Sequence, residues 1–242
     1  MDEARHTASA GRARSRGQGK LVIAIDGPAG SGKSTLAALL AHKFGYTNIE
    51  TGAMYRALAL KAIQRGTPDD SDALAALARE SRIELVPQSE GNRVILDGVD
   101  VTARIRQQDV TEGASRVSVH PPVREWMVER QREMGAGGGV VMEGRDIGTK
   151  VFPDAEVKIF LDAAPEIRGN RRFLQSHGTS KLEASVLAEL RVRDERDRTR
   201  ANSPLVPAAD AVVIDSTNLS LEQVVEKAIE IIKQRLAEIR NW

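Results

Sequence analysis

Several features that mark common protein classes are missing from this 242-residue chain. It has no cysteine, which excludes disulfide frameworks and cysteine-based zinc sites, and its four histidines are too scattered to form a metal site. No apolar run approaches the roughly 18 residues of a membrane span, and the first 20 residues lack the apolar segment of a secretory signal. We therefore expect a cytoplasmic protein without a membrane partner.

Aromatic residues make up only 3% of the sequence, and the formal net charge is +1. Residues 1–20 carry five basic and two acidic side chains, whereas the rest of the chain carries 30 basic and 32 acidic ones. Nucleic-acid binders typically combine a basic body with stacking aromatics, so we expect no nucleic-acid partner. Residues 1–19 have no hydrophobic periodicity, which predicts a disordered basic tail.

The order of apolar segments predicts an α/β fold. Runs typical of strands buried on both faces are residues 21–26, 140–143, 157–162 and 211–215. Helical periodicity is found at residues 35–44, 53–64 and 221–239. Alternating strands and helices indicate a parallel sheet flanked by helices. Residues 66–134 interrupt this alternation with short β runs at 83–87, 93–97 and 99–102, which predicts a small α+β insert.

The clearest chemical signal follows the first predicted strand. Gly27-Pro28-Ala29-Gly30-Ser31-Gly32-Lys33-Ser34 matches the P-loop pattern G-x-x-x-x-G-K-[ST] and precedes a predicted helix. Glycines let backbone N–H groups converge on phosphate oxygens, and the helix N-terminus adds partial positive charge. We predict that Gly27 through Thr35 bind the phosphates of ATP, with Lys33 at the β- and γ-phosphates and the Ser34 hydroxyl on Mg²⁺. The alternative is an ordinary glycine-rich turn.

A second signal lies where a predicted strand meets a helix, in Glu50-Thr51-Gly52-Ala53-Met54-Tyr55-Arg56. Ligands of open α/β folds bind at the carboxyl edge of the sheet, and an arginine there suits an anionic acceptor. Thr51 also fits a helix N-cap, and Tyr55 also fits core packing.

A third signal, Glu143-Gly144-Arg145-Asp146, ends a predicted buried strand. Its acidic residue resembles a Walker-B position, where a carboxylate orders Mg²⁺ through water. A local salt bridge that caps a turn is the alternative.

The fourth signal is the charged run from Arg191 to Arg200. Such runs are usually solvated helix faces with i,i+4 pairs. Arg193, Asp197 and Arg200, however, share one face, where they could hold phosphates and a ribose hydroxyl. Further candidates for mobile cations that close over the phosphate are Arg168, Arg171 and Arg172.

These segments together resemble the bacterial cytidylate kinases over about residues 20–240. The resemblance rests on IDGPAGSGKST, ETGAMYRALAL, EGRDIGTKVFPDAEVKIFLDA and RDERDRTRANSPLVPAADAVVIDST. It implies a P-loop nucleoside monophosphate kinase that uses ATP and Mg²⁺ to convert CMP and dCMP to CDP and dCDP in pyrimidine nucleotide metabolism. It also implies a core (residues 20–65, 135–165 and 204–242), a nucleoside-monophosphate-binding insert (66–134) and a helical lid (166–203). The sequence leaves the oligomeric state open, and we take a monomer as the default.

The resemblance also implies roles for individual residues. Arg56, Arg145 and Arg193 match arginines that hold the CMP phosphate, and Arg200 is a further cation at the transfer site. Ser115, Arg124 and Asp146 match the positions that read cytosine, Asp197 matches the carboxylate on the sugar hydroxyl, and Thr51 and Tyr55 line the acceptor site. With Lys33, the arginines Arg145, Arg193 and Arg200 are the predicted catalytic residues.

The chain departs from the family pattern at three positions: Thr51 replaces a common Ser, Glu143 a common Asp, and Lys150 an apolar residue. Two other functions stay open, a kinase for another small acceptor and a non-catalytic P-loop binding module. The absence of an Asn-Lys-x-Asp segment argues against a GTPase. An acceptor panel with ATP separates these functions.

Overall fold

The computed structural model describes residues 20–67, 69–88, 91–175 and 183–240, so the predicted tail at residues 1–19 lies outside the described residues. A five-stranded parallel sheet with strand order β2-β6-β1-β7-β8 forms its centre. The strands are β1 (Val22–Asp26), β2 (Thr47–Glu50), β6 (Val140–Gly144), β7 (Val157–Asp162) and β8 (Val212–Asp215). The predicted parallel sheet is confirmed.

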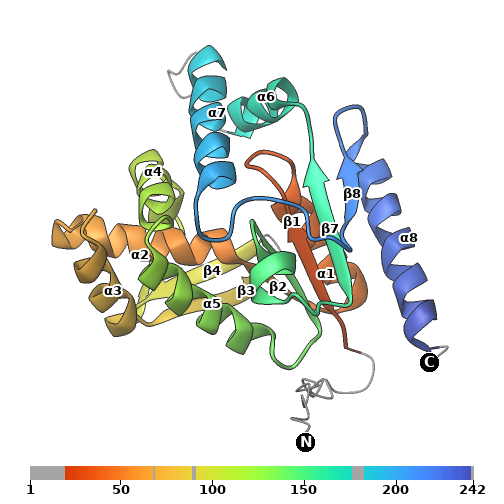
Figure 1. Ribbon diagram of the computed structural model, residues 1–242, viewed down its shortest axis with the longest axis horizontal. Helices are drawn as coiled ribbons and strands as arrows, with labels where there is room; N and C mark the ends of the chain where they lie inside the picture. Colours follow the sequence, from red (N-terminus) through yellow and green to blue (C-terminus); the bar gives the residue numbers. More distant parts are fainter. Residues whose placement is uncertain (1–19, 68, 89–90, 176–182, 241–242) are drawn as a thin grey trace, which may run out of the picture.

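The middle strand β1 shows why its sequence is apolar throughout. Successive side chains of a strand point to opposite faces, and both faces of this sheet are covered. Ile23 and Ile25 pack with residues of α1 (Lys33–Phe44) and α8 (Leu221–Arg240). Val22 and Ala24 belong to the core on the other face, which includes residues of the π-helix η2 (Ile147–Val151). Figure 1 shows α8 running alongside β8 at one edge of the sheet.

A second packed unit lies beside the sheet. It is formed by the part of the chain that follows α2 (Thr51–Arg65) and precedes β6. It contains an antiparallel sheet of β3 (Ile83–Gln88), β4 (Gly91–Leu96) and β5 (Val99–Asp100), followed by a 3₁₀ turn (Arg104–Arg106). Its helices are α3 (Ser71–Glu80), α4 (Gln108–Val117) and α5 (Pro121–Gly135). These strands confirm the predicted antiparallel runs, while the exact limits predicted for the insert, residues 66–134, stay a prediction.

The arginine-rich segment forms two helices, α6 (Pro165–Gln175) and α7 (Glu183–Thr199), beyond the carboxyl end of β7 (Figure 1). They are joined by a buried ion pair between Arg168 and Asp194 at 2.5 Å. Within the described ranges, no helix combines the length and apolar character that a membrane crossing requires.

Candidate functional site

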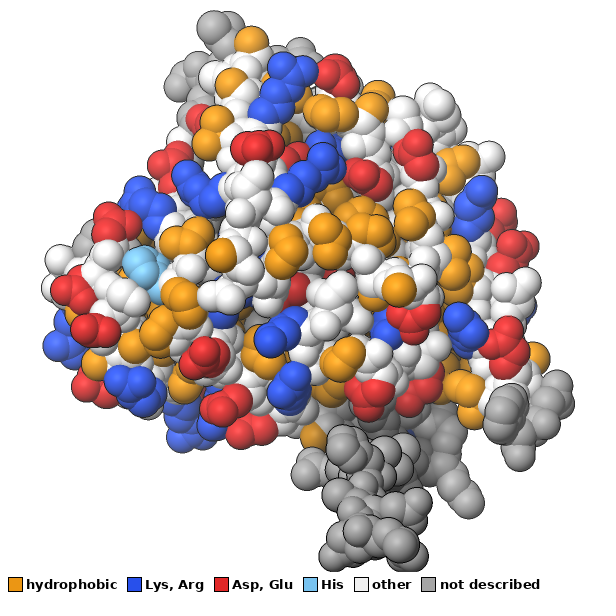
Figure 2. All heavy atoms as spheres, viewed as in Figure 1, with side chains coloured by type: hydrophobic (Ala, Val, Ile, Leu, Met, Phe, Trp, Pro, Cys, Tyr) orange, Lys and Arg blue, Asp and Glu red, His pale blue; other side chains and the backbone are white. Residues whose placement is uncertain are grey.

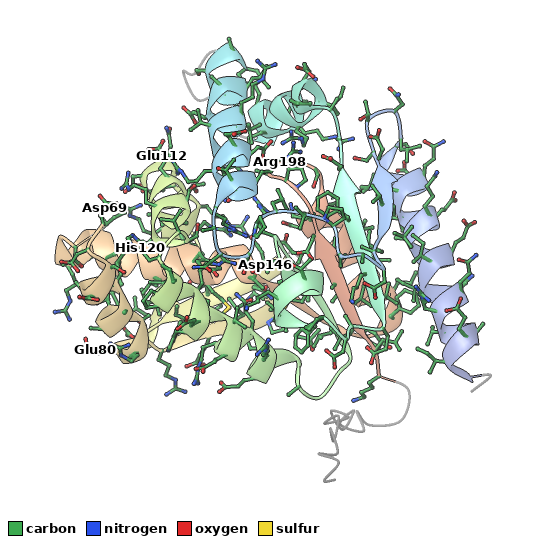
Figure 3. The ribbon with its side chains drawn as sticks, viewed as in Figure 1. Asp69, Glu80, Glu112, His120, Asp146 and Arg198 are labelled. Carbon is green, nitrogen blue, oxygen red and sulfur yellow. The ribbon has the colours of Figure 1, made fainter. Side chains whose placement is uncertain are left out.

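A cavity of about 1830 Å³ opens between the P-loop, α2, α4, α7 and the end of β6. The predicted site residues that line it are Ala29, Gly30, Ser31, Gly32, Lys33, Ser34, Thr35, Thr51, Tyr55, Arg56, Ser115, Arg124, Arg145, Asp146, Arg193, Asp197 and Arg200. Gly27 and Pro28 are not part of its lining. Figure 3 places Asp146 between the end of α7 and η2. Figure 2 shows basic and acidic side chains mixed over the face in view, without a single large basic patch there.

The P-loop depends on its glycines for both conformation and space. Gly27, Gly30 and Gly32 have φ angles of 147°, 78° and 100°, in the region that side chains of L-residues rarely adopt. A Cβ atom at Gly27 would also lie 2.0 Å from the backbone oxygen of Leu161 on β7. Helix α1 begins directly after Gly32, with no acidic residue in its first turn. The loop therefore presents an uncompensated helix N-terminus to the cavity, as an anion site requires.

Lys33, the first residue of α1, is buried in the loop. Its ammonium donates to the Pro28 carbonyl at 2.6 Å and lies 3.5 Å from the Ser31 hydroxyl oxygen. Burial, followed by repulsion from the Arg145 guanidinium, lowers the pKa of Lys33 to about 7. An anionic ligand at this position would favour the charged form of the lysine.

Ser34 and Glu143 form the oxygen-donor pair that fits Mg²⁺. The Ser34 hydroxyl donates to Glu143 Oε1 at 3.1 Å, and Glu143, the next-to-last residue of β6, is almost wholly buried. Burial raises the pKa of Glu143 although the charge of Lys33 opposes it, so a cation beside this carboxylate would stabilise its ionised form. Hard oxygen ligands in small number, completed by water and phosphate oxygens, suit Mg²⁺. The described residues contain no group of three His, Cys, Asp or Glu that could hold a metal by themselves.

The interpretation of Thr51 as a helix N-cap is wrong. The helix α2 begins at Thr51 itself, and the preceding Glu50 provides no side-chain cap. The Thr51 hydroxyl instead donates to the backbone oxygen of Glu143 at 2.8 Å. Thr51 thus ties the start of α2 to the end of β6, beside the residue pair that fits Mg²⁺.

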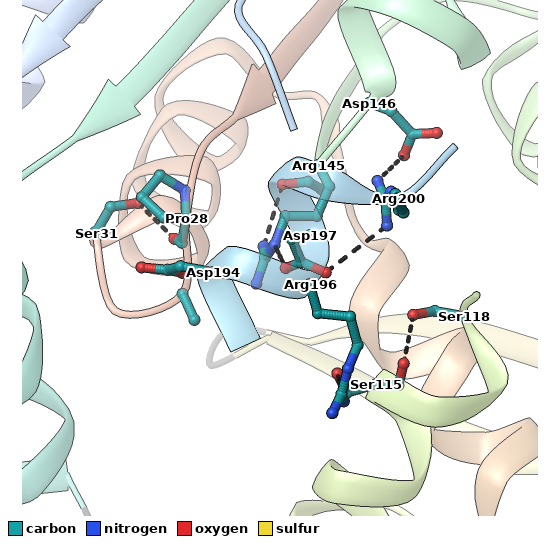
Figure 4. Close-up of polar contacts among 12 residues, drawn as sticks. Pro28, Ser31, Ser115, Ser118, Arg145, Asp146, Asp194, Arg196, Asp197 and Arg200 are labelled. Carbon is teal, nitrogen blue, oxygen red and sulfur yellow. Dashed lines mark hydrogen bonds and ion pairs between the residues drawn. The ribbon is translucent and has the colours of Figure 1, made fainter. Parts of the chain in front are cut away.

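Two carboxylates organise the arginines that line the cavity (Figure 4). Asp197 accepts from Arg145 Nε at 2.9 Å and lies 3.8 Å from Arg200. Asp146 forms an ion pair with Arg124, and the two side chains are only 8% and 5% exposed, respectively. Asp146 also lies 3.9 Å from Arg200. Burial alone would raise the pKa of Asp197, but the Arg145 and Arg193 guanidiniums hold it below its ordinary value. Both carboxylates are therefore acceptors within a cationic pocket.

Among the described residues, Arg193 has no carboxylate partner within ion-pair distance, whereas Arg56, Arg124 and Arg145 each pair with one. Its Nε is buried and has no hydrogen-bond partner in the part of the chain that the structure describes. Burial, with repulsion from Arg145, lowers the pKa of Arg193 to about 10. Arg56 also lines the cavity and pairs with Glu50. A buried donor without a partner costs free energy, and an anionic ligand would remove that cost.

Ser115 and Tyr55 lie on the insert side of the same pocket. The Ser115 hydroxyl oxygen accepts from Arg196 Nη1 at 2.8 Å. The Tyr55 ring lies 5.8 Å from the Arg124 guanidinium carbon, and burial raises the pKa of Tyr55 to about 12. Tyr55 is thus a neutral aromatic wall at physiological pH.

Two of the suggested mobile cations are fixed by the structure. Arg168 donates to the backbone oxygens of Ala163 at 2.8 Å and Ala29 at 3.1 Å, besides its pair with Asp194. Arg171 donates to the backbone oxygens of Ser31 at 3.3 Å and Ser216 at 2.9 Å. Both side chains fasten α6 to the P-loop. The suggestion that Arg168 moves over the phosphate is therefore not supported by its contacts.

Asp26 and Arg196 were not singled out from the sequence. Asp26 ends β1 and accepts from the backbone N–H groups of Ile147 at 2.8 Å and Gly148 at 2.7 Å. Burial raises its pKa to about 6, although these two hydrogen bonds oppose the shift. Asp26 thereby fixes the start of η2, directly after Arg145 and Asp146.

Comparison with known proteins identifies the family. The family model described as "Cytidylate kinase" matches residues 23–234. The cytidylate kinase of Pasteurella multocida is 46% identical over 220 residues, covering 90% of this chain and 97% of that protein. The cytidylate kinase of Citrifermentans bemidjiense is 48% identical, covering 90% and 95%, and that of Pelotomaculum thermopropionicum is 52% identical, covering 86% and 93%. The chain belongs to the cytidylate kinase family.

Proposed function

We propose that this protein transfers the γ-phosphoryl group of ATP to CMP and dCMP, producing CDP and dCDP for pyrimidine nucleotide metabolism. The observation that carries the proposal is one continuous cavity that joins the P-loop to Arg193, whose buried Nε has no partner among the described residues. A donor phosphate at the loop and an acceptor phosphate at Arg193 would share a single space. Family membership supports cytidine nucleotides as the acceptors.

On the donor side, Gly27 through Thr35 bind the triphosphate of ATP. Lys33 exchanges its contact with the Pro28 carbonyl for oxygens of the β- and γ-phosphates. Ser34 would hold Mg²⁺ through its hydroxyl, and Glu143 would hold the ion's water ligands. When bound, the ion supplies positive charge beside the phosphates.

On the acceptor side, Arg56, Arg145 and Arg193 hold the phosphate of CMP, and Arg200 contributes further charge. The acceptor oxygen is already anionic, so the transfer requires no strong general base. The arginines reduce its repulsion from the γ-phosphate and align it for in-line attack, which makes positioning and electrostatics the main sources of catalysis.

The nucleoside is recognised by polar groups deeper in the pocket. Asp146 accepts from the exocyclic amino group of cytosine, and Arg124 and Ser115 donate to its acceptors. Asp197 accepts from a sugar hydroxyl. These roles fit the observed burial of Asp146 and Arg124, because a matching base satisfies groups that water cannot reach.

An acceptor panel tests the proposal. ADP formation from ATP is measured with CMP, dCMP, UMP, AMP, GMP and a set of sugar acids, each with and without Mg²⁺. CMP and dCMP are expected to give the highest kcat/KM, with little ADP formed in the absence of an acceptor. A preference for a purine nucleotide or a sugar acid would overturn the acceptor assignment, and no acceptor-dependent ADP would overturn the kinase function.

A further inference from the structure

Ser115 on α4 is connected directly to α7. Arg196 extends from α7 and donates through Nη1 to the Ser115 hydroxyl oxygen at 2.8 Å (Figure 4). Both residues line the cavity, and Ser115 is only 6% exposed. The contact therefore links the two walls that face each other across the acceptor pocket.

This contact restricts what the Ser115 hydroxyl can do. A serine hydroxyl ordinarily donates one hydrogen bond and accepts others, whereas a guanidinium can only donate. The Ser115 oxygen must therefore accept from Arg196, and its proton must point elsewhere. The nearby Ser118 hydroxyl donates to the Ser115 backbone oxygen at 3.0 Å, and the Ser115 hydroxyl itself donates no hydrogen bond to any of the described residues. The hydroxyl is left as a hydrogen-bond donor.

A fixed donor distinguishes the two common pyrimidines at one atom. N3 of cytosine is an acceptor, whereas N3 of uracil carries a hydrogen and donates. A serine free to rotate can serve either base. With uracil, the Ser115 oxygen would have to accept hydrogen bonds from both Arg196 and N3–H. The Ser115 proton would then point away from the base and lack a partner at a buried position, which costs free energy.

We propose that Arg196 is a positioning residue for base selection, which fixes the Ser115 hydroxyl as a donor to the N3 acceptor of cytosine. The inference rests on the proposed function, because it concerns how that acceptor is chosen. Since Arg196 belongs to α7 and Ser115 to α4, the selection operates while these helices are in contact.

A double-mutant cycle tests the proposal. kcat/KM for CMP and UMP is measured for wild type, Arg196→Met and Arg196→Lys, and again for each in a Ser115→Ala background. Arg196→Met is expected to lower the CMP/UMP ratio about three- to tenfold, the range for one hydrogen bond. Lysine also only donates, so Arg196→Lys is expected to retain more of the ratio. In the Ser115→Ala background, Arg196→Met is expected to leave the ratio unchanged.

The matched control is Arg198→Met, because Arg198 is an exposed residue of the same helix that lines a different cavity. Its kcat/KM values are expected to stay within about twofold of wild type. A ratio that falls equally in both Ser115 backgrounds would overturn the inference, because Arg196 would then act on the substrate directly. An unchanged ratio in Arg196→Met would overturn it as well.

A substrate analogue provides a second test, whose main comparison is made on the wild type. In 3-deaza-CMP a C–H group replaces N3, so the kcat/KM of the wild type is expected to be about three- to tenfold lower with this analogue than with CMP. Ser115→Ala lacks the donor to N3, so its kcat/KM values for CMP and the analogue are expected to be similar. Equal use of CMP and the analogue by the wild type overturns this inference alone. A wild type inactive with CMP overturns the proposed function and this inference together.

Discussion

Binding of ATP should draw a proton onto Lys33. With its pKa lowered to about 7 by burial and by Arg145, the side chain is about nine-tenths neutral at pH 8 in the free protein. Phosphate oxygens that replace the Pro28 carbonyl carry negative charge, which favours the ammonium and raises the pKa again. We expect an uptake of about 0.9 proton per MgATP bound at pH 8, and of about 0.1 at pH 6, where Lys33 is already charged.

The proton number follows from isothermal titration calorimetry. MgATP is titrated into the protein without an acceptor, at one pH, in buffers of different ionisation enthalpy. The slope of the observed enthalpy against buffer ionisation enthalpy gives the number of protons exchanged. The measurement at pH 8 carries the larger expected signal because most Lys33 side chains are neutral there before MgATP binds.

The matched control for this measurement is Lys33→Arg, which keeps the positive charge in a side chain that stays protonated. Its binding of MgATP is expected to show almost no proton uptake at pH 8. A slope near zero for the wild type at pH 8 would refute the reasoning, because Lys33 would then be charged before the nucleotide binds. An equal slope in Lys33→Arg would assign the proton to another group.

Three further predictions concern recognition, stability and metal use. Asp146→Asn is expected to lower kcat/KM for CMP by about tenfold and to narrow the CMP/UMP ratio, because its amide can donate as well as accept; a lower CMP rate at constant ratio would contradict a role in base reading. Arg168→Met is expected to reduce the free energy of unfolding by about 3–5 kcal/mol, because it leaves buried Asp194 unpaired. The control Arg191→Met breaks an exposed ion pair and is expected to reduce it by less than about 1 kcal/mol. Equal melting temperatures for the two variants would refute the role of the buried pair. Glu143→Gln is expected to raise the Mg²⁺ concentration for half-maximal rate by about tenfold, measured at fixed ATP, and an unchanged value would remove Glu143 from the metal site.

The P-loop and the sheet could be predicted because their signals are local. The glycines, Lys33 and Ser34 are contiguous, and the strand before them is apolar at every position because both its faces are covered. The short strands of the insert were equally visible, since turn residues separate them.

Residues whose function depends on distant partners could not be assigned from local pattern alone. Asp26 looks like the polar end of a buried strand, yet its partners are backbone groups 121 and 122 residues away. Arg168 lies in a charged segment whose composition is typical of an exposed helix, but its contacts with Ala29 and Asp194 make it a buried residue. For Thr51, the N-cap expectation failed because the helix starts one residue earlier than a cap requires and the hydroxyl finds a partner on β6.

In the proposed acceptor pocket, one side chain can both contact the substrate and hold a second contact residue in place. This double role limits what the replacement of such a residue can show. Asp197 is the proposed sugar contact, and the same carboxylate holds Arg145, a proposed phosphate contact, at 2.9 Å. Replacing Asp197 would therefore release Arg145 and weaken phosphate binding together with sugar binding, so a loss of activity could not be divided between them. Comparing CMP with dCMP on the unaltered protein removes one hydroxyl and leaves the Arg145–Asp197 pair intact. The ratio of kcat/KM for these two substrates is thus the direct measure of any contact to the 2′-hydroxyl.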